Sequence, residues 1–490
     1  MSPRTEAIGP PISGPSSLGP GRIRHYGGVV RTLPAIRWIV AAAVASSVTV
    51  SCDGTQPERP SSPNALHVVV DTDMGTDDVM ALLFLLERPD VEVDAVTVVG
   101  DGLAHCDAGV RNARSLLALE GEPDTPVACG GRLPLAGTNT FPEEWRVYSD
   151  DLSSVPGLPG PTGDAYDGTA VDLLLETLDP DTTLLTLGPL TNVAQALRAD
   201  PGLGDRVPRV VAMAGAVDAS GNAPNAVAEY NVWIDALAAK EVVGSMPVEL
   251  VPLDASNFVP ATPFFVDTLG NHLGTPAARA IHAILSTNQQ IETGTYYFWD
   301  PLAAGLVVEP DLATWETDRL LVTASLDAGA GWISGWDRGD ETRFAVRADG
   351  LRFERMFLST VTGERVRDVR PAPDLSVSFD GRRCRIDRDS LDAGGVIVAF
   401  RNTSRTQAMV IVGGLTGTTY RELLDLVGEP GSVVHGAPEG VVQIAWLTAA
   451  AGARTFAAAE ADPGEAGVFC FLPAGDAARV WPGGHIRIAG

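Results

Sequence analysis

The chain has 490 residues, 45% of them hydrophobic, which is enough to bury the core of one large domain together with a smaller one. Its formal net charge of −27 argues against nucleic-acid polymers and anionic membrane surfaces as partners, because like charges repel. The charge places no such restriction on a small neutral ligand.

Residues 1–52 indicate an export signal rather than part of a folded domain. A stretch rich in Pro, Gly and Ser comes first and predicts disorder. Arg31 and Arg37 then precede an apolar run of about a dozen residues, too short for a membrane span, and small residues lead to Cys52. This order resembles a bacterial lipoprotein signal. We therefore expect an exported protein anchored to the cell surface at Cys52, with residues 53–65 as a polar tether. A plain signal peptide cut elsewhere, giving a secreted protein, is the alternative.

Four cysteines remain after Cys52, and two of them fall in each predicted domain. In an oxidising compartment, the pairs Cys106–Cys129 and Cys384–Cys470 are the expected disulfides. The sequence alone leaves their connectivity open.

A turn dense in carboxylates follows the first predicted strand. Val68–Val70 predict a buried strand, and the apolar run from Val79 predicts a helix. Carboxylates this close repel one another unless protons or a cation intervene, and a hard divalent cation, Ca²⁺ before Mg²⁺, is the natural solution. Capping of the helix N-terminus explains one or two of these acids but not all four. The four are Asp71, Asp73, Asp77 and Asp78.

The spacing of this turn separates it from two other acidic motifs. An EF-hand loop counted from Asp71 requires Gly and Glu where the chain has Thr76 and Leu82. A phosphotransfer aspartate motif expects Thr or Val where the chain has Gly75. The pattern Asp-x-Asp-x-Gly-x-Asp-Asp instead resembles the calcium-dependent nucleoside hydrolases, the inosine–uridine-preferring family.

Strands and helices alternate through residues 66–363, which predicts an α/β domain with a mostly parallel central sheet flanked by helices. Ligands of such sheets bind beyond the carboxyl ends of the strands, where Asp73 and Asp101 are expected. The resemblance covers the same residues in five motifs, and it implies the nucleoside hydrolase fold. Asp101 stands where that family usually has Asn.

The resemblance also implies a set of metal ligands. Asp300 begins an Asp-Pro-Leu-Ala motif that matches the distal calcium-binding aspartate of the family, and this match favours a metal ligand over a simple helix cap before Pro301. Leu187 matches a residue that binds calcium through its backbone carbonyl. The implied Ca²⁺ ligands are Asp73, Asp78, Leu187 and Asp300.

Further matches imply a binding site for ribose and base. Met213 ends a strand that resembles the family's Met-Gly-Gly strand end. Trp299 replaces the His that protonates the departing base in several members, and Trp233, Tyr296, Tyr297 and Phe298 are further aromatic residues that could stack on the base. Asp77, Asn222, Glu229 and Asn231 match the residues that hold the ribose hydroxyls, whereas taken alone such residues usually cap loops.

Beyond residue 363, a charged, Pro-containing linker is expected over 364–375. Short apolar strands separated by Gly, Asn and Ser then predict a β-sandwich over 376–490. Two segments faintly resemble cupredoxins, but only His485 follows Cys470, and a blue-copper site needs two His and a Cys. We expect no copper site and a structural or spacer role.

The resemblance implies calcium-dependent hydrolysis of the N-glycosidic bond of ribonucleosides, with Asp73 as the catalytic base and a small nucleoside as substrate. Two alternatives stay open. One is a non-catalytic, calcium-dependent ribose- or nucleoside-binding lipoprotein, and the other is a hydrolase of another N-riboside. Family members are often dimers or tetramers, so a homo-oligomer is implied by analogy only, and a lipid anchor would be the sole membrane contact.

Overall fold

The computed structural model describes residues 65–292, 294–366, 373–434, 440–449, 452, 454–474 and 477–490. The predicted signal with Cys52, the tether up to residue 64 and the middle of the predicted linker lie outside these ranges. Within them, no helix combines the length and apolar character that crossing a membrane requires.

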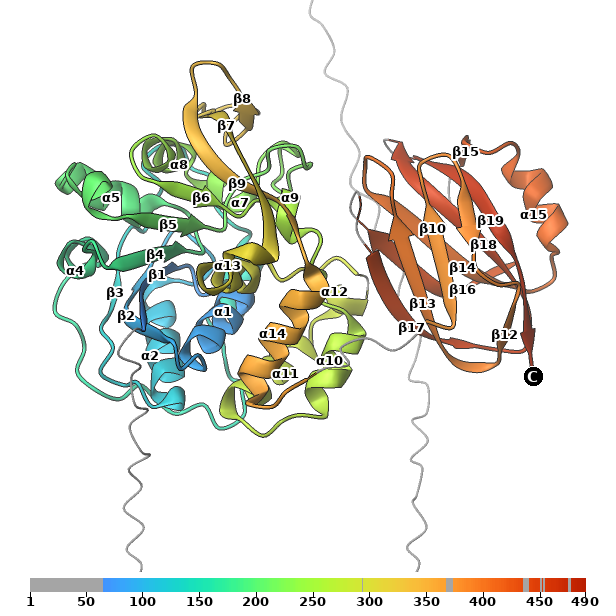
Figure 1. Ribbon diagram of the computed structural model, residues 1–490, viewed down its shortest axis with the longest axis horizontal. Coiled ribbons are helices and arrows are strands. Elements are labelled where there is room, and N and C mark those ends of the chain that lie inside the picture. The colour runs from blue at the N-terminus through green and yellow to red at the C-terminus, as the bar shows by residue number, and fades with distance from the viewer. Residues whose placement is uncertain are drawn as a thin grey trace, which may run out of the picture. The chain divides into compact units, whose positions relative to one another are not determined.

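A nine-stranded sheet forms the centre of the first folded part, in the order β3-β2-β1-β4-β5-β6-β9-β7-β8 (Figure 1). All pairs from β3 to β9 are parallel, whereas β7 runs antiparallel to both β9 and β8. The predicted mostly parallel sheet is therefore confirmed. The strands are β1 (Leu66–Thr72), β2 (Val91–Val98), β3 (Val127–Cys129), β4 (Thr182–Thr186), β5 (Arg209–Ala212), β6 (Val248–Leu250), β7 (Ala313–Val322), β8 (Ile333–Gly335) and β9 (Asp340–Ala348).

Helices cover both faces of this sheet, because alternate residues of each strand point to opposite sides. In β1, Val68 and Val70 join one buried cluster and Val69 joins the other. The first cluster includes α1 (Thr76–Leu86), α2 (Cys106–Glu120), α11 (Pro276–Leu285), α13 (Trp299–Val308) and α14 (Gly350–Thr362). The second includes α4 (Ala170–Thr177), α5 (Thr191–Ala199) and α8 (Ala236–Val243). Shorter helices are α3 (Glu143–Ser149), α6 (Leu203–Arg206), α7 (Tyr230–Ile234), α9 (Leu253–Ser256), α10 (Pro263–Gly270), α12 (Gln289–Glu292) and η1 (Pro310–Leu312).

Phe357 of α14 is the centre of an aromatic cluster in the first core. It is fully buried, and its ring centroid lies 5.3 Å from that of Phe84 and 5.6 Å from that of Phe353. Replacement of Phe357 by Ala leaves a cavity, so we expect the free energy of unfolding to fall by about 3–5 kcal/mol. Leu351→Ala, at an exposed position of the same helix, is the control, with an expected change within about 0.5 kcal/mol. Urea unfolding measures both, and equal midpoints would contradict this description of the core.

The C-terminal strands form two sheets that enclose one buried cluster. One sheet has the order β11-β10-β13-β17, and the other contains β12-β19-β18-β14-β16, with β15 paired to β19. Val398, Val410 and Val468 meet in the cluster between them, as expected for a β-sandwich. The elements are β10 (Leu375–Phe379), β11 (Cys384–Ile386), β12 (Ser390–Asp392), β13 (Gly394–Asn402), β14 (Ala408–Leu415), α15 (Tyr420–Val427), β15 (Ser432–Val434), β16 (Val441–Ala449), β17 (Arg454–Ala461), β18 (Gly464–Ala474) and β19 (Ala477–Ala489).

Both predicted disulfides are present. Cys106–Cys129 ties the first turn of α2 to the end of β3, and Cys384–Cys470 ties β11 to β18. Each bond lies within one of the two folded parts.

Candidate active site

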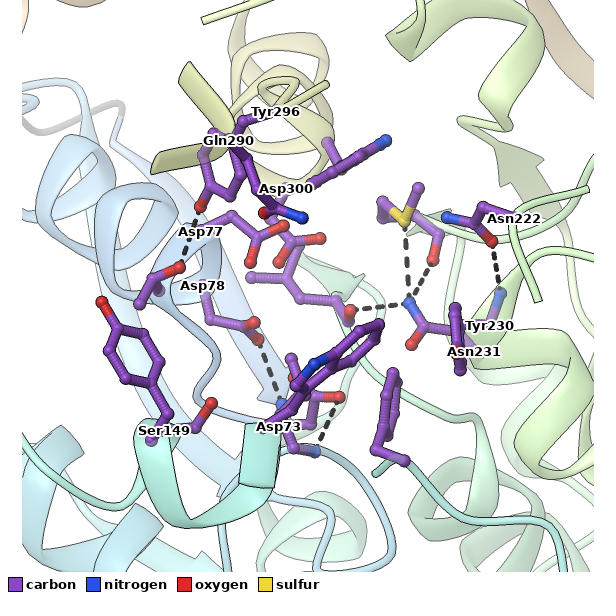
Figure 2. A pocket seen from close by; sticks show the side chains of 18 of the residues that line it. Asp73, Asp77, Asp78, Ser149, Asn222, Tyr230, Asn231, Gln290, Tyr296 and Asp300 are labelled. Atoms are coloured by element: carbon purple, nitrogen blue, oxygen red, sulfur yellow. Dashed lines mark hydrogen bonds between the residues drawn. The ribbon is translucent and has the colours of Figure 1, made fainter. Parts of the chain in front are cut away.

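A cavity of about 560 Å³ opens at the carboxyl ends of the parallel strands, where ligands of such sheets bind. Asp73, Leu187 and Met213 follow β1, β4 and β5 directly, and Asp300 lies in the first turn of α13. The cavity brings together the ten residues to which the sequence assigned a catalytic, metal-binding or principal substrate-binding role, although those roles stay predictions. These residues are Asp73, Asp77, Asp78, Leu187, Met213, Asn222, Glu229, Asn231, Trp299 and Asp300. Figure 2 labels six of them: Asp73, Asp77, Asp78, Asn222, Asn231 and Asp300.

Three carboxylates form the most compact part of the site. Oxygens of Asp77, Asp78 and Asp300 lie within 4.8 Å of one another. Asp78 also closes the turn before α1, since it accepts the N–H groups of Asp73 and Gly75, both at 3.0 Å, and the Thr72 hydroxyl. Capping therefore accounts for Asp78 but leaves the other two carboxylates unexplained.

Asp73 is held at the bottom of the cavity by close backbone. Its Oδ2 accepts the Leu103 N–H at 3.1 Å. Gly102 and Gly188 both pack against it, and a Cβ on either glycine would overlap the Asp73 side chain. The two glycines thus allow the loops after β2 and β4 to approach this carboxylate.

Burial makes these acids hard to ionise. Burial, followed by the charge of Asp78, raises the pKa of Asp73 well above its ordinary value and raises that of Asp77 to about 7. Burial, followed by the charge of Asp77, raises the pKa of Asp300 well above its ordinary value. The acids therefore need protons or a cation, and carboxylates beside a backbone carbonyl fit a hard divalent cation.

Asp71, the fourth acid of the motif, does not line the cavity. It lies inside β1, where its Oδ1 accepts the Thr97 hydroxyl at 2.6 Å and the Asn192 amide at 2.8 Å. The expectation that all four acids crowd into one turn is thus wrong for Asp71, because β1 continues to Thr72 and keeps this residue in the sheet.

The cavity wall opposite the cluster of Asp77, Asp78 and Asp300 carries carboxylate and amide groups from α7 and the loop before it. Glu229 caps α7 and accepts the N–H groups of Asn231 at 2.8 Å and Gly215 at 3.1 Å. Burial raises the pKa of Glu229 to about 7. The Asn231 amide donates to the Leu187 carbonyl at 2.9 Å, and Asn222 accepts the Tyr230 N–H at 3.0 Å. Glu229 and Asn222 therefore accept hydrogen bonds from nearby backbone N–H groups and also line the cavity.

An aromatic wall completes the cavity, and sequence reasoning missed most of it. Trp145 and Tyr148 come from the short helix α3, and Phe141 stacks on Tyr230 with ring centroids 4.9 Å apart. Trp145 lies 5.5 Å from the same Tyr230 ring. Two aromatic residues three apart on an exposed short helix were the available signal.

Only one of the four additional aromatic candidates lines the cavity. Tyr296 does so, and its hydroxyl lies 2.9 Å from that of Thr76. Trp233 and Tyr297 are not among the lining residues, and Phe298 is fully buried in the core against Phe265. The suggestion that Phe298 stacks on a base is therefore wrong, whereas for Trp233 and Tyr297 it stays a prediction.

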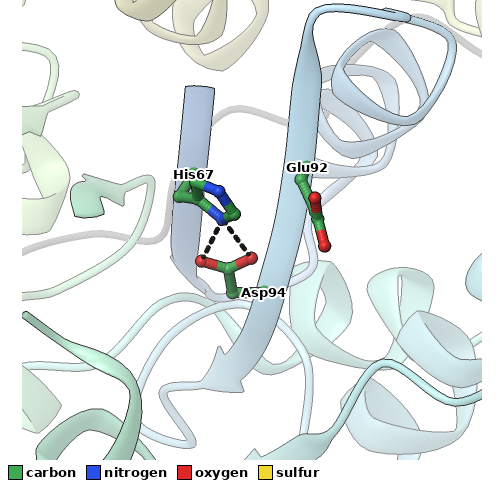
Figure 3. Close-up of side chains that lie close together, drawn as sticks. All are labelled: His67, Glu92 and Asp94. Atoms are coloured by element: carbon green, nitrogen blue, oxygen red, sulfur yellow. Dashed lines mark hydrogen bonds and ion pairs between the residues drawn. The ribbon is translucent and has the colours of Figure 1, made fainter. Parts of the chain in front are cut away.

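A second group of metal-capable side chains, His67, Glu92 and Asp94, lies on β1 and β2 (Figure 3). His67 Nδ1 is 2.9 Å from Asp94 Oδ1, and this hydrogen bond raises the pKa of His67. The two side chains are 42% and 22% exposed. Because both side chains are partly exposed, we interpret the group as a surface ion pair. Such a pair contributes at most about 1 kcal/mol to stability.

Comparisons with known proteins agree with this geometry. A family model described as inosine-uridine preferring nucleoside hydrolase matches residues 68–355. The chain is 30% identical over 259 residues to the pyrimidine-specific ribonucleoside hydrolase RihA of Salmonella schwarzengrund, covering 51% of this chain and 82% of the relative. It is 36% identical over 197 residues to an uncharacterized protein of Schizosaccharomyces pombe, covering 39% of this chain and 62% of that protein.

Among solved structures, the inosine-uridine preferring nucleoside hydrolase from Bacillus anthracis is similar, with a TM-score of 0.54 and 26% sequence identity. The match covers 61% of this chain and 99% of that structure.

Proposed function

The chain belongs to the inosine-uridine preferring nucleoside hydrolase family, and on that premise we propose that it hydrolyses the N-glycosidic bond of ribonucleosides in a calcium-dependent reaction that releases ribose and free base. One observation carries the proposal. In a single cavity, a carboxylate cluster from the β1–α1 turn and α13 faces the amide and carboxylate groups around α7.

Asp73, Asp78, Asp300 and the Leu187 carbonyl would hold the ion, with Asp77 beside them. All are oxygen donors, which suit Ca²⁺. When bound, the ion supplies positive charge that keeps these carboxyls ionised and lowers the pKa of nearby water.

Asp73 acts as the base in this proposal. Its carboxylate takes a proton from the attacking water, and the Leu103 N–H keeps that carboxylate oriented. Hydrogen bonds to the ribose hydroxyls come from Asp77, Asn222, Glu229 and Asn231. These bonds favour the distorted, oxocarbenium-like sugar of the transition state, as in glycoside hydrolysis generally.

Trp299 contributes an aromatic surface for the base. We expect Trp299→Ala to raise KM for a preferred nucleoside by about tenfold, because base–aromatic stacking contributes roughly 1–3 kcal/mol per base. Trp336→Ala, at a half-exposed position outside the cavity lining, is the control and should leave KM unchanged. Initial-rate kinetics on inosine and uridine measure both variants. An unchanged KM in Trp299→Ala would exclude this residue from base binding.

The direct test of the activity is release of free base, followed by chromatography, from inosine, uridine, adenosine and nicotinamide riboside. The Salmonella relative is named for pyrimidine nucleosides and the Bacillus structure for inosine and uridine, so the panel includes both base classes. Release from at least one riboside is expected. No release from any of the four, with nucleoside still bound, would favour the non-catalytic alternative.

Export to the cell surface is part of the proposal. Two disulfides support it, since such bonds persist in oxidising compartments, and the N-terminal sequence ending in Cys52 supports a lipid anchor. Mass spectrometry of the mature N-terminus should find a lipidated Cys52. An intact N-terminus in the cytosolic fraction would contradict export.

A further inference from the structure

A single hydroxyl group lies between two buried carboxyl groups beneath the cavity. Thr191 Oγ1, at the start of α5, is 2.8 Å from Asp101 Oδ2 and 2.9 Å from Asp235 Oδ2. All three residues are buried. A hydroxyl carries one proton and can donate to only one of the two oxygens. The other contact is favourable only if that carboxyl group is itself protonated and donates to the hydroxyl.

Asp235 has the environment of the ionised partner. Its Oδ2 accepts the Leu135 N–H at 2.6 Å and its Oδ1 accepts the Ala238 N–H at 3.1 Å, which caps α8. Burial raises the pKa of Asp235 as well, but these N–H groups oppose that shift, because backbone donors at a helix N-terminus stabilise a negative charge. The Thr191 proton therefore points to Asp235.

Asp101 has the environment of the neutral partner. Its Oδ1 is buried and has no hydrogen-bond partner within the described part of the chain. Burial, with a smaller contribution from the charge of Asp235, raises the pKa of Asp101 to about 7, against the lowering effects of the contact with Thr191 and of Arg146. Arg146 itself donates to the Gly100 carbonyl at 2.9 Å.

Residues 102–104, which follow Asp101, contact the proposed catalytic base, Asp73. Gly102 packs against the Asp73 side chain, where a Cβ would overlap it. Leu103 N–H donates to Asp73 Oδ2 at 3.1 Å, and Ala104 N–H donates to the Asp73 carbonyl at 2.8 Å. A bond that fixes Asp101 therefore fixes the orientation of the Asp73 carboxylate.

We propose that Asp101 is a neutral carboxylic acid that donates its proton to Thr191 Oγ1 and so positions residues 102–104 against Asp73. It is a positioning residue and takes no proton from substrate or water. The side chain of Asn has the same shape, is neutral, and places an N–H donor where the acid places its O–H. Asn is thus the matched replacement at this position.

Two substitutions at Asp101 test the kinetic part, which rests on the proposed function. Asp101→Asn should keep kcat within about twofold. Asp101→Ala should lower kcat by about ten- to a hundredfold, because displacing the catalytic carboxylate of Asp73 by a fraction of an ångström to about 1 Å slows the reaction by that factor. KM should change less than kcat in both. Thr191→Ser, which keeps the hydroxyl, should resemble wild type, and Thr191→Val should resemble Asp101→Ala. Equal loss of kcat in Asp101→Asn and Asp101→Ala would overturn the positioning role.

Infrared difference spectroscopy tests the protonation state without any turnover. At pH 6, the wild-type spectrum minus that of Asp101→Asn should contain the C=O stretch of a protonated carboxylic acid. The exposed Asp164→Asn is the control and should remove only a carboxylate band. If the Asp101 difference also shows only a carboxylate band, the proposal is wrong. If wild type releases no base, the proposed function fails, and the infrared band still decides whether Asp101 is neutral.

Discussion

Asp73→Asn is expected to lower kcat by about a thousandfold or more, while the affinity for nucleoside changes only several-fold. The substitution keeps the shape of the side chain and its acceptor for the Leu103 N–H, but it removes the group that takes the proton from water. Steady-state kinetics give kcat, and isothermal titration gives the affinity. Asp164→Asn, the same chemical change at an exposed position, should leave both unchanged.

Because Asp73 is also a proposed ligand of the ion, the calcium content of the Asp73→Asn protein must be measured alongside its kinetics. Loss of turnover with calcium and nucleoside still bound identifies Asp73 as the base. Turnover within tenfold of wild type would place the base elsewhere and contradict the mechanism.

Calcium is expected to stabilise the fold, by an amount that grows between about pH 5 and pH 8. In the metal-free protein, the pKa of Asp77 is raised by burial from 3.8 to about 7, and the pKa values of Asp73 and Asp300 are raised as well. A carboxyl with a raised folded-state pKa makes the fold most stable below its unfolded-state pKa. That contribution is lost as the pH rises toward the folded-state pKa. Calcium replaces the protons, so its effect increases over the same interval.

Thermal unfolding at pH 5, 6, 7 and 8, with calcium or with a chelator, measures this dependence. At a concentration a hundred times the Kd, the ion should contribute about 2.7 kcal/mol. Asp300→Asn is the matched control and should remove most of the difference between the two conditions. A calcium effect that is equal at every pH would show that these carboxyls do not bind the ion.

Local sequence predicted the fold of residues 66–363 well, because each strand, turn and helix of a parallel sheet is encoded by neighbouring residues. The apolar run in β1, Gly75 and the acids of α1 all lie between Val68 and Asp78. The site residues came from the same short motifs. Since the carboxyl ends of parallel strands meet at one edge, motifs far apart in sequence were expected in one place.

Contacts between distant side chains could not be predicted in this way. Trp145 reaches Tyr230 across 85 positions, and Thr191 joins Asp101 to Asp235 across intervals of 90 and 44. Neither contact produces a hydrophobic periodicity in the sequence from which it could be predicted. Asp71 was misplaced for a related reason, since a motif gives the order of its acids but does not say which of them still lies inside the strand.

Ribose release before and after removal of calcium tests the central claim most directly. The protein, confirmed metal-free by elemental analysis after chelation, is assayed with its best riboside and assayed again after calcium is restored. The account predicts that chelation abolishes ribose release and that calcium restores it. Undiminished release by the metal-free protein, or no release from any riboside with calcium bound, would contradict it.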